Sequence, residues 1–377
     1  MTKTQTIWFE NIQFSELSGL LNFAKAGSKS PFLSRAFLES WFCAKKGEIH
    51  GFALYDNSQL KHFVLIGESI TNHFGLQIRS AHLNQSGLCS DNQIWIEYND
   101  LFSSESSGDR FPVIFINALF EELAARNYHQ LQISMGCPSL AKLVELSTYK
   151  LSSVSTEGFI RTLLPHSSVD EIITTLSSKS RTKIRRSIRK LEESFGPIKL
   201  DVAESNSSIE QFFSGLSSLH KQKWNNTLHG SGFSNTTFKE TLLKLLVVYP
   251  QSYTILRFSA GNVNIGYCLY FLGEKSVYFY CSGVNHAIAS SHIKPGYVIH
   301  LFAMSYFSKR NFLEYDFMGG DSQYKRTLCD KTSYFYSVDI PLKNAKGYLI
   351  LLFRHVKPVV RSITQFFSKH LLDSHQQ

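Results

Sequence analysis

Three side chains that can move protons or hold charge follow a glycine pair late in the sequence. Asp321, Tyr324 and Lys325 come directly after Gly319-Gly320. A carboxylate can accept a proton, a phenol can donate one, and an ammonium can stabilise negative charge. Because glycine lets a backbone approach a ligand closely, this spacing predicts a site for acid–base chemistry. The alternative is an ordinary helix start, with Asp321 as its cap and Lys325 in solvent.

A run of positive charge lies between residues 179 and 190. Seven of these twelve residues are Lys or Arg, Arg185 and Arg186 among them, and none is acidic. The formal net charge of the chain is +9, so most of the excess lies in this one segment. Such a cluster indicates a bound polyanion: donor phosphates, a tRNA backbone, an acidic glycan or anionic lipid headgroups. A solvated helix face is the alternative.

Two further groups of candidates lie on predicted helices. Lys294, Gly296 and Tyr297 open a helix, whose first N–H groups and dipole favour an anion such as a phosphate. His220 and Trp224 are four residues apart on another helix and therefore share a face. They form either a wall of an acceptor pocket or a packed aromatic beside a hydrogen-bonded histidine.

Strand positions supply the remaining candidates. Tyr278 and Tyr280 point to the same side of one predicted strand, where they either pack in the core or face a bound acyl group. Tyr280 is the better candidate for that contact, and Asp316 on the following strand is counted as substrate-binding. The six cysteines are scattered singly without zinc-ligand spacing, so no metal site is predicted.

These candidates must be positioned by a regular order of elements in the second half. Apolar spacing predicts a helix over residues 178–195, capped by Ser177 or Ser178 and ended by Gly196-Pro197. Then follow a strand, two helices, a three-strand meander, a helix, a strand, a short helix and a strand. Their approximate ranges are 198–203, 209–219, 235–247, 253–258, 265–272, 277–282, 295–305, 312–317, 322–328 and 334–340.

The first half gives nearly the same order, with helices near 15–24, 34–44 and 112–125 and strands near 51–55, 62–66 and 95–98. Arg126-Asn127-Tyr128 and Gly136 align with Arg310-Asn311-Phe312 and Gly320 at a constant offset of 184 residues. We therefore expect an internal repeat. After the shared glycine, the first copy has Cys137, Leu140 and Ala141 in place of the acid, phenol and ammonium. Only the second copy is predicted to carry chemistry.

Length and composition favour two lobes. The chain has 377 residues, a length that exceeds what one hydrophobic core usually serves, and 43% of them are apolar, which is ample for burial. We place the lobes at 1–165 and 166–345, followed by an amphipathic helical tail at 346–377. The start lacks the apolar stretch of a secretion signal, so a cytoplasmic protein is expected. Segment 348–372 mixes apolar and basic residues, and either packs on the lobe or lies on the inner face of a membrane.

The element order resembles the GNAT acyltransferase fold. More closely, residues 177–340 resemble the bacterial acetyltransferase family related to the cellulose-biosynthesis CelD proteins. The two-lobe arrangement also resembles the Fem peptidyltransferases, which use aminoacyl-tRNA as donor. The loop at Lys294 departs from the Gln/Arg-x-x-Gly-x-Gly/Ala pattern that usually holds the pyrophosphate of coenzyme A. Four segments carry the resemblance: Ser180–Arg186, Leu219–Trp224, Lys294–Gly296 and Tyr315–Arg326.

The resemblance implies an α/β (α+β) protein with tandem GNAT-like lobes, each a mixed, mostly antiparallel sheet flanked by helices. It also implies an acyltransferase that moves an acyl group, most simply from acetyl-CoA, to an amine or hydroxyl of a sugar, polysaccharide or cell-envelope precursor. Transfer would occur by direct attack within a ternary complex. Two alternatives stay open: an aminoacyl-tRNA-dependent transferase, and a non-catalytic anion-binding protein with the same fold.

The resemblance also distributes roles among the candidates. Asp321 would orient or deprotonate the acceptor, Tyr324 would protonate the leaving group, Lys325 would hold charge, and Tyr280 would face the acyl group. The residues expected to bind the acyl donor are Lys294, Gly296, Tyr297, Arg185 and Arg186. Those expected to bind the acceptor are Trp224, His220 and Asp316.

Overall fold

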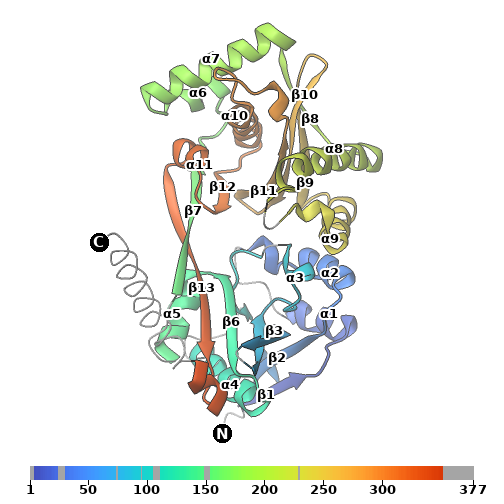
Figure 1. Ribbon diagram of the computed structural model, residues 1–377, viewed down its shortest axis with the longest axis vertical. Coiled ribbons are helices and arrows are strands. Elements are labelled where there is room, and N and C mark those ends of the chain that lie inside the picture. Colours follow the sequence, from blue (N-terminus) through green and yellow to red (C-terminus); the bar gives the residue numbers. More distant parts are fainter. Residues whose placement is uncertain are drawn as a thin grey trace, which may run out of the picture.

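The computed structural model describes residues 4–23, 30–73, 75–94, 96–104, 111–147, 153–227 and 230–350. Two α/β lobes are stacked along the long axis of the molecule (Figure 1). The predicted membrane-surface segment 348–372 lies outside the described residues from position 351 onward. In the described part of the chain, none of the helices is both long enough and apolar enough to cross a membrane.

The N-terminal lobe begins with a strand and two helices before its three-strand meander. A short helix, a two-residue strand, a long helix, a strand and a further helix follow, and the last strand leaves the lobe. The elements are β1 (Thr4–Phe9), α1 (Phe14–Phe23), α2 (Arg35–Ala44), β2 (Ile49–Asp56), β3 (Gln59–His73), β4 (Leu76–Leu83), α3 (Cys89–Asn92), β5 (Phe102–Ser103), α4 (Phe111–Ala125), β6 (Gln130–Gly136), α5 (Pro138–Ser147) and β7 (Ser153–Thr162).

The C-terminal lobe repeats this order after two additional helices, and the predicted elements of this half are confirmed. The predicted basic helix forms over its full range, with the Ser177 hydroxyl accepting from Ser180 N–H at its start. The elements are α6 (Val169–Thr174), α7 (Ser178–Phe195), β8 (Ile198–Val202), α8 (Asn206–Trp224), α9 (Thr236–Val248), β9 (Tyr253–Ala260), β10 (Val263–Leu272), β11 (Ser276–Val284), α10 (Pro295–Ser308), β12 (Glu314–Gly319), α11 (Gln323–Leu328) and β13 (Lys331–Pro341).

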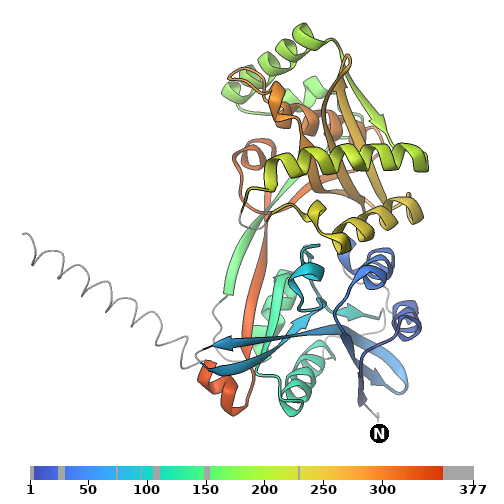
Figure 2. The same cartoon turned by 45° about the vertical axis from the view of Figure 1, so that its right-hand side comes forward.

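One continuous sheet runs through both lobes, and the two lobes exchange their last strands. The strand order is β1-β2-β3-β4-β6-β13-β7-β12-β11-β10-β9-β8. Strand β7 pairs antiparallel with β12 of the other lobe, and β13 pairs antiparallel with β6. These two long strands also pair with each other and connect the lobes (Figures 1 and 2). The two sheets are therefore hydrogen-bonded into one, so the lobes cannot shift freely against each other.

The predicted internal repeat is confirmed by matching local geometry. Asn127 and Asn311, which are 184 residues apart, both take a left-handed conformation after a helix, with φ of 59° and 63°. Next to them, Tyr128 N–H donates to Leu123 and Phe312 N–H donates to Phe307, so both helices end in the same way. In each lobe the next strand lies parallel to the third strand of the meander.

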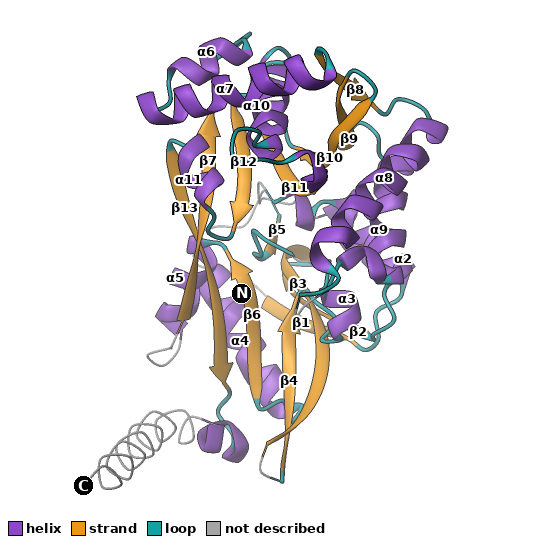
Figure 3. Cartoon of the chain, turned by 45° about the horizontal axis from the view of Figure 1, so that its top comes forward, coloured by secondary structure: helices purple, strands orange, loops and turns teal. Residues whose placement is uncertain are grey.

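Helices cover both faces of the sheet in the C-terminal lobe (Figure 3). Side chains of α6, α7, α10 and α11 pack on one face in a single apolar core. On the other face, α8 and α9 share a core with α1 and α2 of the N-terminal lobe. A separate core lies under α4 and α5.

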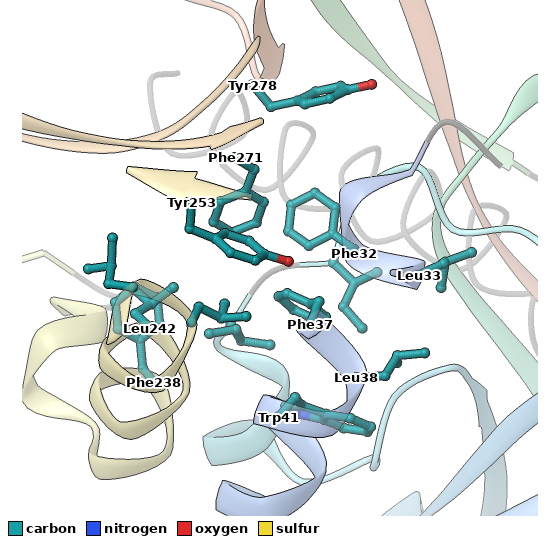
Figure 4. Close-up of a cluster of buried hydrophobic side chains, with 14 of the residues drawn as sticks. Phe32, Leu33, Phe37, Leu38, Trp41, Phe238, Leu242, Tyr253, Phe271 and Tyr278 are labelled. Atoms are coloured by element: carbon teal, nitrogen blue, oxygen red, sulfur yellow. The ribbon is translucent and has the colours of Figure 1, made fainter. Parts of the chain in front are cut away.

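The shared core fixes the junction between the lobes (Figure 4). The rings of Phe32 and Phe37 from the N-terminal lobe pack against Phe271, with centroids 5.2 and 6.1 Å away. Tyr253 also contacts Phe271, and its hydroxyl lies 3.1 Å from the hydroxyl of Ser34. Burial of large aromatic side chains contributes strongly to stability, so this core stabilises the contact between the two lobes.

One predicted strand is wrong. Residues 96–98 do not form a strand, and the third strand of the N-terminal meander is β4 instead. The chain leaves the sheet after Leu83 and crosses to the other lobe, and Tyr98 takes a positive φ of 54°. Of the residues that suggested a strand here, Ile96 and Tyr98 pack in the core that the two lobes share.

Candidate functional site

Strands β11 and β12 are paired only at their beginnings. Their parallel register covers Ser276 with Glu314, Val277 with Tyr315, and Tyr278 with Asp316. Beyond that point both strands continue without pairing to each other, and β11 contains a register shift at Tyr280. The sheet therefore opens at the middle of the C-terminal lobe, and the side chains that follow Tyr278 and Asp316 surround this opening.

A pocket of about 460 Å³ lies on the α7 and α10 side of the lobe. Three cationic side chains and one histidine are among its lining residues. The guanidinium of Arg186 lies 3.0 Å from Nε2 of His292, and Lys294 N–H donates to the Ser187 hydroxyl at 2.7 Å. The basic helix is thus fastened to the loop that precedes α10. The pocket is lined by Ser178, Lys179, Thr182, Lys183, Arg186, Ser291 and His292.

The start of α10 lies directly after this pocket. Lys294 is the residue that precedes the first turn, and its side chain makes no capping hydrogen bond. Gly296 has open space where a side chain would project, so the backbone is accessible at that position. Lys183 Nζ lies 5.7 Å from the centre of the Tyr297 ring. A helix start beside three cations can hold a phosphate group.

The other charges of the basic helix are used elsewhere. Arg181 donates to the backbone carbonyls of Thr174 and Leu176 at the end of α6. Arg185 lies 3.8 Å from Asp170, outside the pocket. Arg189 and Lys190 both pair with Glu193. Of the two arginines predicted to bind the donor, the structure brings only Arg186 to the pocket, because Arg185 faces a carboxylate of α6.

A tight turn follows β12 and is held by charged side chains from both lobes. Met318 and Gly320 have positive φ values of 61° and 96°. Met318 N–H donates to Asp316 at 2.6 Å, and Gly319 N–H donates to Oε2 of Glu97 at 2.7 Å. Lys325 Nζ donates to the Gly319 carbonyl at 2.6 Å. Two carboxylates and an ammonium therefore surround one turn, and we call Glu97, Asp316 and Lys325 the junction cluster.

The junction cluster is electrostatically unusual. Asp316 and Lys325 are buried, at 3% and 8% exposure, while Glu97 is partly exposed. Burial raises the pKa of Asp316 to about 6, although hydrogen bonds from the Tyr98 hydroxyl and Met318 N–H oppose this shift. Burial also raises the pKa of Glu97 to about 7. Burial lowers the pKa of Lys325, against the attraction of both carboxylates. Perturbed groups of this kind are typical of functional sites.

The start of α10 and the helix α11 lie on the same face of the sheet. The Tyr297 hydroxyl donates to the Thr327 hydroxyl at 3.4 Å. The rings of His300 and Tyr324 are stacked, with centroids 5.1 Å apart. Burial lowers the pKa of His300 to about 3, so this imidazole is neutral at pH 7. The predicted donor loop and the turn holding Lys325 are thus connected through packed aromatic side chains.

Two predicted catalytic residues lie outside this arrangement. Asp321 is exposed, and both of its oxygens accept from the guanidinium of Arg326. Tyr280 stacks on Phe271 at 4.6 Å, and its hydroxyl donates to the Ile94 carbonyl of the other lobe. Tyr280 therefore occupies the packed position that was its alternative, while Asp321 forms a surface ion pair.

His220 and Trp224 share a face of α8, as their spacing predicts, with ring centroids 6.0 Å apart. Nδ1 of His220 lies 2.8 Å from the Ser231 hydroxyl, and the ring packs edge-on against Phe233. Burial lowers the pKa of His220 to about 4, so it is neutral at pH 7. The histidine is packed and hydrogen-bonded, and only Trp224, at 39% exposure, offers a surface to a ligand.

No sequence motif marks Glu97 and Tyr98 as site residues. Both lie in a part of the chain that was interpreted as a strand of the other lobe. Lys183 and His292 were within or beside the predicted donor segments, and the structure brings them together. A long segment between β4 and α4, rich in polar residues and without clear periodicity, was the one available signal for a functional loop.

Comparison with known proteins agrees with this geometry. Residues 178–326 match the profile of the acetyltransferase (GNAT) domain, so the C-terminal lobe carries a GNAT acyltransferase domain. The match gives no support to an aminoacyl-tRNA donor. No curated protein sequence matches the chain.

Several solved structures share the two-lobe fold. A conserved protein of unknown function from Bacteroides thetaiotaomicron superimposes with a TM-score of 0.53 at 10% identity, covering 89% of this chain and 99% of that one. FemX gives a TM-score of 0.53 at 8% identity, covering 88% and 96%. A tandem GNAT protein from the clavulanic acid pathway gives 0.50 at 6% identity, covering 91% and 100%. At these identities the comparisons establish the tandem fold that the sequence predicted.

Proposed function

We propose that this protein transfers an acyl group, most simply acetyl, from acyl-coenzyme A to an amine or hydroxyl group. The cationic pocket at the start of α10 carries the proposal, because it lies within the domain that matches the acetyltransferase profile. Lys179, Lys183 and Arg186 supply the charge that a diphosphate requires. The pattern usually found in this loop is absent, and these side chains of α7 take its place.

Direct transfer is the chemistry that the site supports. Burial raises the pKa of the Cys329 thiol to about 12 and that of Cys268 to about 12, so neither is a thiolate at pH 7. A covalent route through cysteine would need a lowered thiol pKa. Tyr324, stacked on His300, is retained as the candidate donor of a proton to the departing thiolate.

The acceptor that we propose belongs to the sugar class. A sugar, polysaccharide or cell-envelope precursor is suggested by the likeness of segments such as Leu219–Trp224 and Tyr315–Arg326 to the CelD-related acetyltransferases. Trp224 is an exposed aromatic surface at the end of α8, and aromatic rings commonly stack on sugar rings. We place the protein in the cytoplasm, where acyl-coenzyme A is made.

The test compares two neighbouring arginines by calorimetry with acetyl-CoA. Arg186→Glu places a negative charge in the pocket and is expected to weaken binding at least tenfold, which corresponds to about 1.4 kcal/mol. Arg185→Glu makes the same change of charge on the same helix, outside the pocket, and is expected to change binding less than threefold. Equal losses in both variants would show that only the general charge of the helix matters. No binding by the wild-type protein would exclude the donor.

A turnover measurement separates an enzyme from an anion-binding protein with the same fold. Release of free coenzyme A from acetyl-CoA is followed with a panel of amine acceptors that begins with glucosamine. Acceptor-dependent release is expected. Tight binding of acetyl-CoA without release in the presence of any acceptor would favour the non-catalytic alternative.

A further inference from the structure

The loop after β4 extends to Asn99, which forms an isolated β-bridge with Gly136. It has little regular structure, but hydrogen bonds hold both of its ends. Asn84 is fully buried; its carbonyl oxygen accepts from Leu65 N–H at 2.9 Å, and its amide donates to Asn99 at 2.8 Å. Asn99 is also fully buried and donates to the Leu83 carbonyl at 3.0 Å. Both ends of the loop are thus fixed to the sheet of the N-terminal lobe.

The far end of this loop contacts the C-terminal lobe at the opening between β11 and β12. The Ile94 carbonyl accepts from the Tyr280 hydroxyl, and the Tyr98 hydroxyl donates to Asp316. The Tyr98 ring also packs edge-on against Tyr278, with centroids 5.7 Å apart. Glu97 lies between these two contacts. The N-terminal lobe therefore places one carboxylate beside the strands where the sheet of the other lobe opens.

The three charged groups of the junction cluster differ in their hydrogen bonds and in their exposure. Asp316 is buried, and both of its oxygens accept hydrogen bonds, from Met318 N–H and from the Tyr98 hydroxyl. Lys325 is buried and donates to the carbonyls of the turn. For Glu97, the contacts among the described residues engage only Oε2, through Gly319 N–H. Glu97 is also the one member of the cluster that is partly exposed.

Space around this carboxylate depends on a glycine. A side chain at position 319 would begin 3.3 and 3.4 Å from the two carboxylate oxygens of Glu97 and 2.6 Å from the end of Met135. Any larger residue would therefore crowd the carboxylate. The glycine therefore keeps the turn from crowding either oxygen of Glu97.

We propose that Glu97 is the general base of the acyl transfer, so that the N-terminal lobe completes the active site of the C-terminal lobe. This inference rests on the proposed function. The lone pair of the acceptor nitrogen or oxygen attacks the thioester carbonyl carbon; the new C–N or C–O bond forms, and the C–S bond breaks with its electron pair on sulfur. The acceptor proton passes to Glu97, and the thiolate takes a proton from Tyr324 or water. Glu97 then returns its proton to solvent, and Tyr324, where it was the donor, regains a proton from solvent.

The surroundings of Glu97 suit this role. Burial, and the negative charge of Asp316, raise its pKa, while Gly319 N–H and the charge of Lys325 lower it. Burial, with a smaller contribution from the negative charge of Glu97, raises the pKa of Tyr98 and of Tyr280. A base works best when its pKa lies near the working pH, because it is then both ionised and able to hold a proton. An ordinary exposed glutamate would be too weak a base.

The proposal also accounts for the unequal repeats. After its own glycine, the N-terminal copy carries Cys137, Leu140 and Ala141 in place of the acid, phenol and ammonium of the second copy. That lobe therefore lacks the acidic, phenolic and ammonium side chains that a second site of this kind would need. It keeps the fold and contributes a base through the loop that follows β4.

The test uses the full-length protein, acetyl-CoA and glucosamine or another accepted amine. Glu97→Gln is expected to lower kcat/KM for the acceptor about hundredfold at pH 7 and to remove the limb of the pH profile near 7, with acetyl-CoA affinity unchanged. Glu97→Ala is expected to regain part of its activity in sodium formate, which a structural role would not predict. Glu157→Gln removes a partly exposed carboxylate from β7, whose backbone carbonyl accepts from Gly320 N–H of the same turn, and is expected to keep the wild-type profile.

Two results would overturn the proposal in distinguishable ways. Absence of acyl transfer by the wild-type protein would refute the proposed function itself. Normal turnover by Glu97→Gln, with the wild-type pH profile retained, would refute the role of Glu97 alone. If the Gln variant does not fold, Glu97→Asp is tested instead. A shift of the pH-profile limb near 7, with a lowered kcat and an unchanged KM for acetyl-CoA, supports Glu97 as the general base. An unshifted pH profile refutes that role.

Discussion

A base that is kept partly buried should cost the folded protein stability, and this can be measured without any substrate. The pKa of Glu97 lies at about 7 in the fold, against an ordinary value of 4.5. The folded state therefore favours the protonated form, and ionisation is harder in the fold than in the unfolded chain. Stability attributable to this group is complete below the ordinary pKa and is lost as pH rises through the window from 4.5 to about 7.

The magnitude follows from this difference. Each unit of pKa corresponds to about 1.4 kcal/mol, so complete ionisation of Glu97 destabilises the fold by about 3 kcal/mol. Solvent that reaches the partly exposed carboxylate screens this effect and reduces it to about 2 kcal/mol. Glu97→Gln keeps the shape and an oxygen for Gly319 N–H but cannot ionise. The variant is therefore expected to gain about 2 kcal/mol over wild type between pH 5 and pH 8.5.

Urea unfolding at pH 5, 7 and 8.5 measures this gain for wild type and variant in parallel. Glu121→Gln, on the exposed side of α4, is the matched control and should show no pH-dependent difference from wild type. If the difference between Glu97→Gln and wild type were the same at all three values, Glu97 would ionise in the fold as readily as in the unfolded chain. The argument for a tuned base would then fail. A gain in stability with a loss of turnover is the combination expected of a functional residue.

Three other substitutions test separate parts of the structure. In Gly283→Ala, the new methyl group would lie 2.6 Å from a backbone oxygen of α8, so we expect a loss of about 2 kcal/mol or more by urea unfolding. Tyr98→Phe removes the hydroxyl that donates to Asp316, so the pKa of Asp316 should rise further; with less negative charge on Asp316, the limb of the kcat/KM profile that belongs to Glu97 should move to lower pH. Asp321→Ala breaks only the exposed ion pair with Arg326, so thermal unfolding should change by less than about 1 kcal/mol and turnover by no more than a few-fold.

Local signals in the sequence were sufficient for the C-terminal lobe. The helix α7 forms from its predicted cap to its predicted end because the cap, the apolar stripe and Gly196 act over a few residues. The repeat was visible because the same helix ending needs the same residue types, with Asn127 and Asn311 in the left-handed conformation. Family likeness then indicated which end of the sheet carries the site.

The site itself could be predicted only in part. The pocket collects Lys183, Arg186 and His292 from two segments that the sequence had already marked as cationic or as a helix start. Asp321 was a reasonable candidate from its place after the glycines, yet nothing local shows that its neighbour Arg326 pairs with it. Periodicity reports which face a residue occupies, but it does not report which distant chain segment covers that face.

Glu97 and its hydrogen-bond partner Gly319 are separated by 222 positions, and two features of the fold bring them together. Exchange of β7 and β13 makes the two sheets one, and the aromatic core around Phe271 holds the lobes in a fixed relation. Because close-packed interiors and continuous sheets resist small displacements, the carboxylate is held against the turn with little freedom. A catalytic base can therefore come from a separate lobe only if that lobe cannot move. The exchanged strands supply this condition.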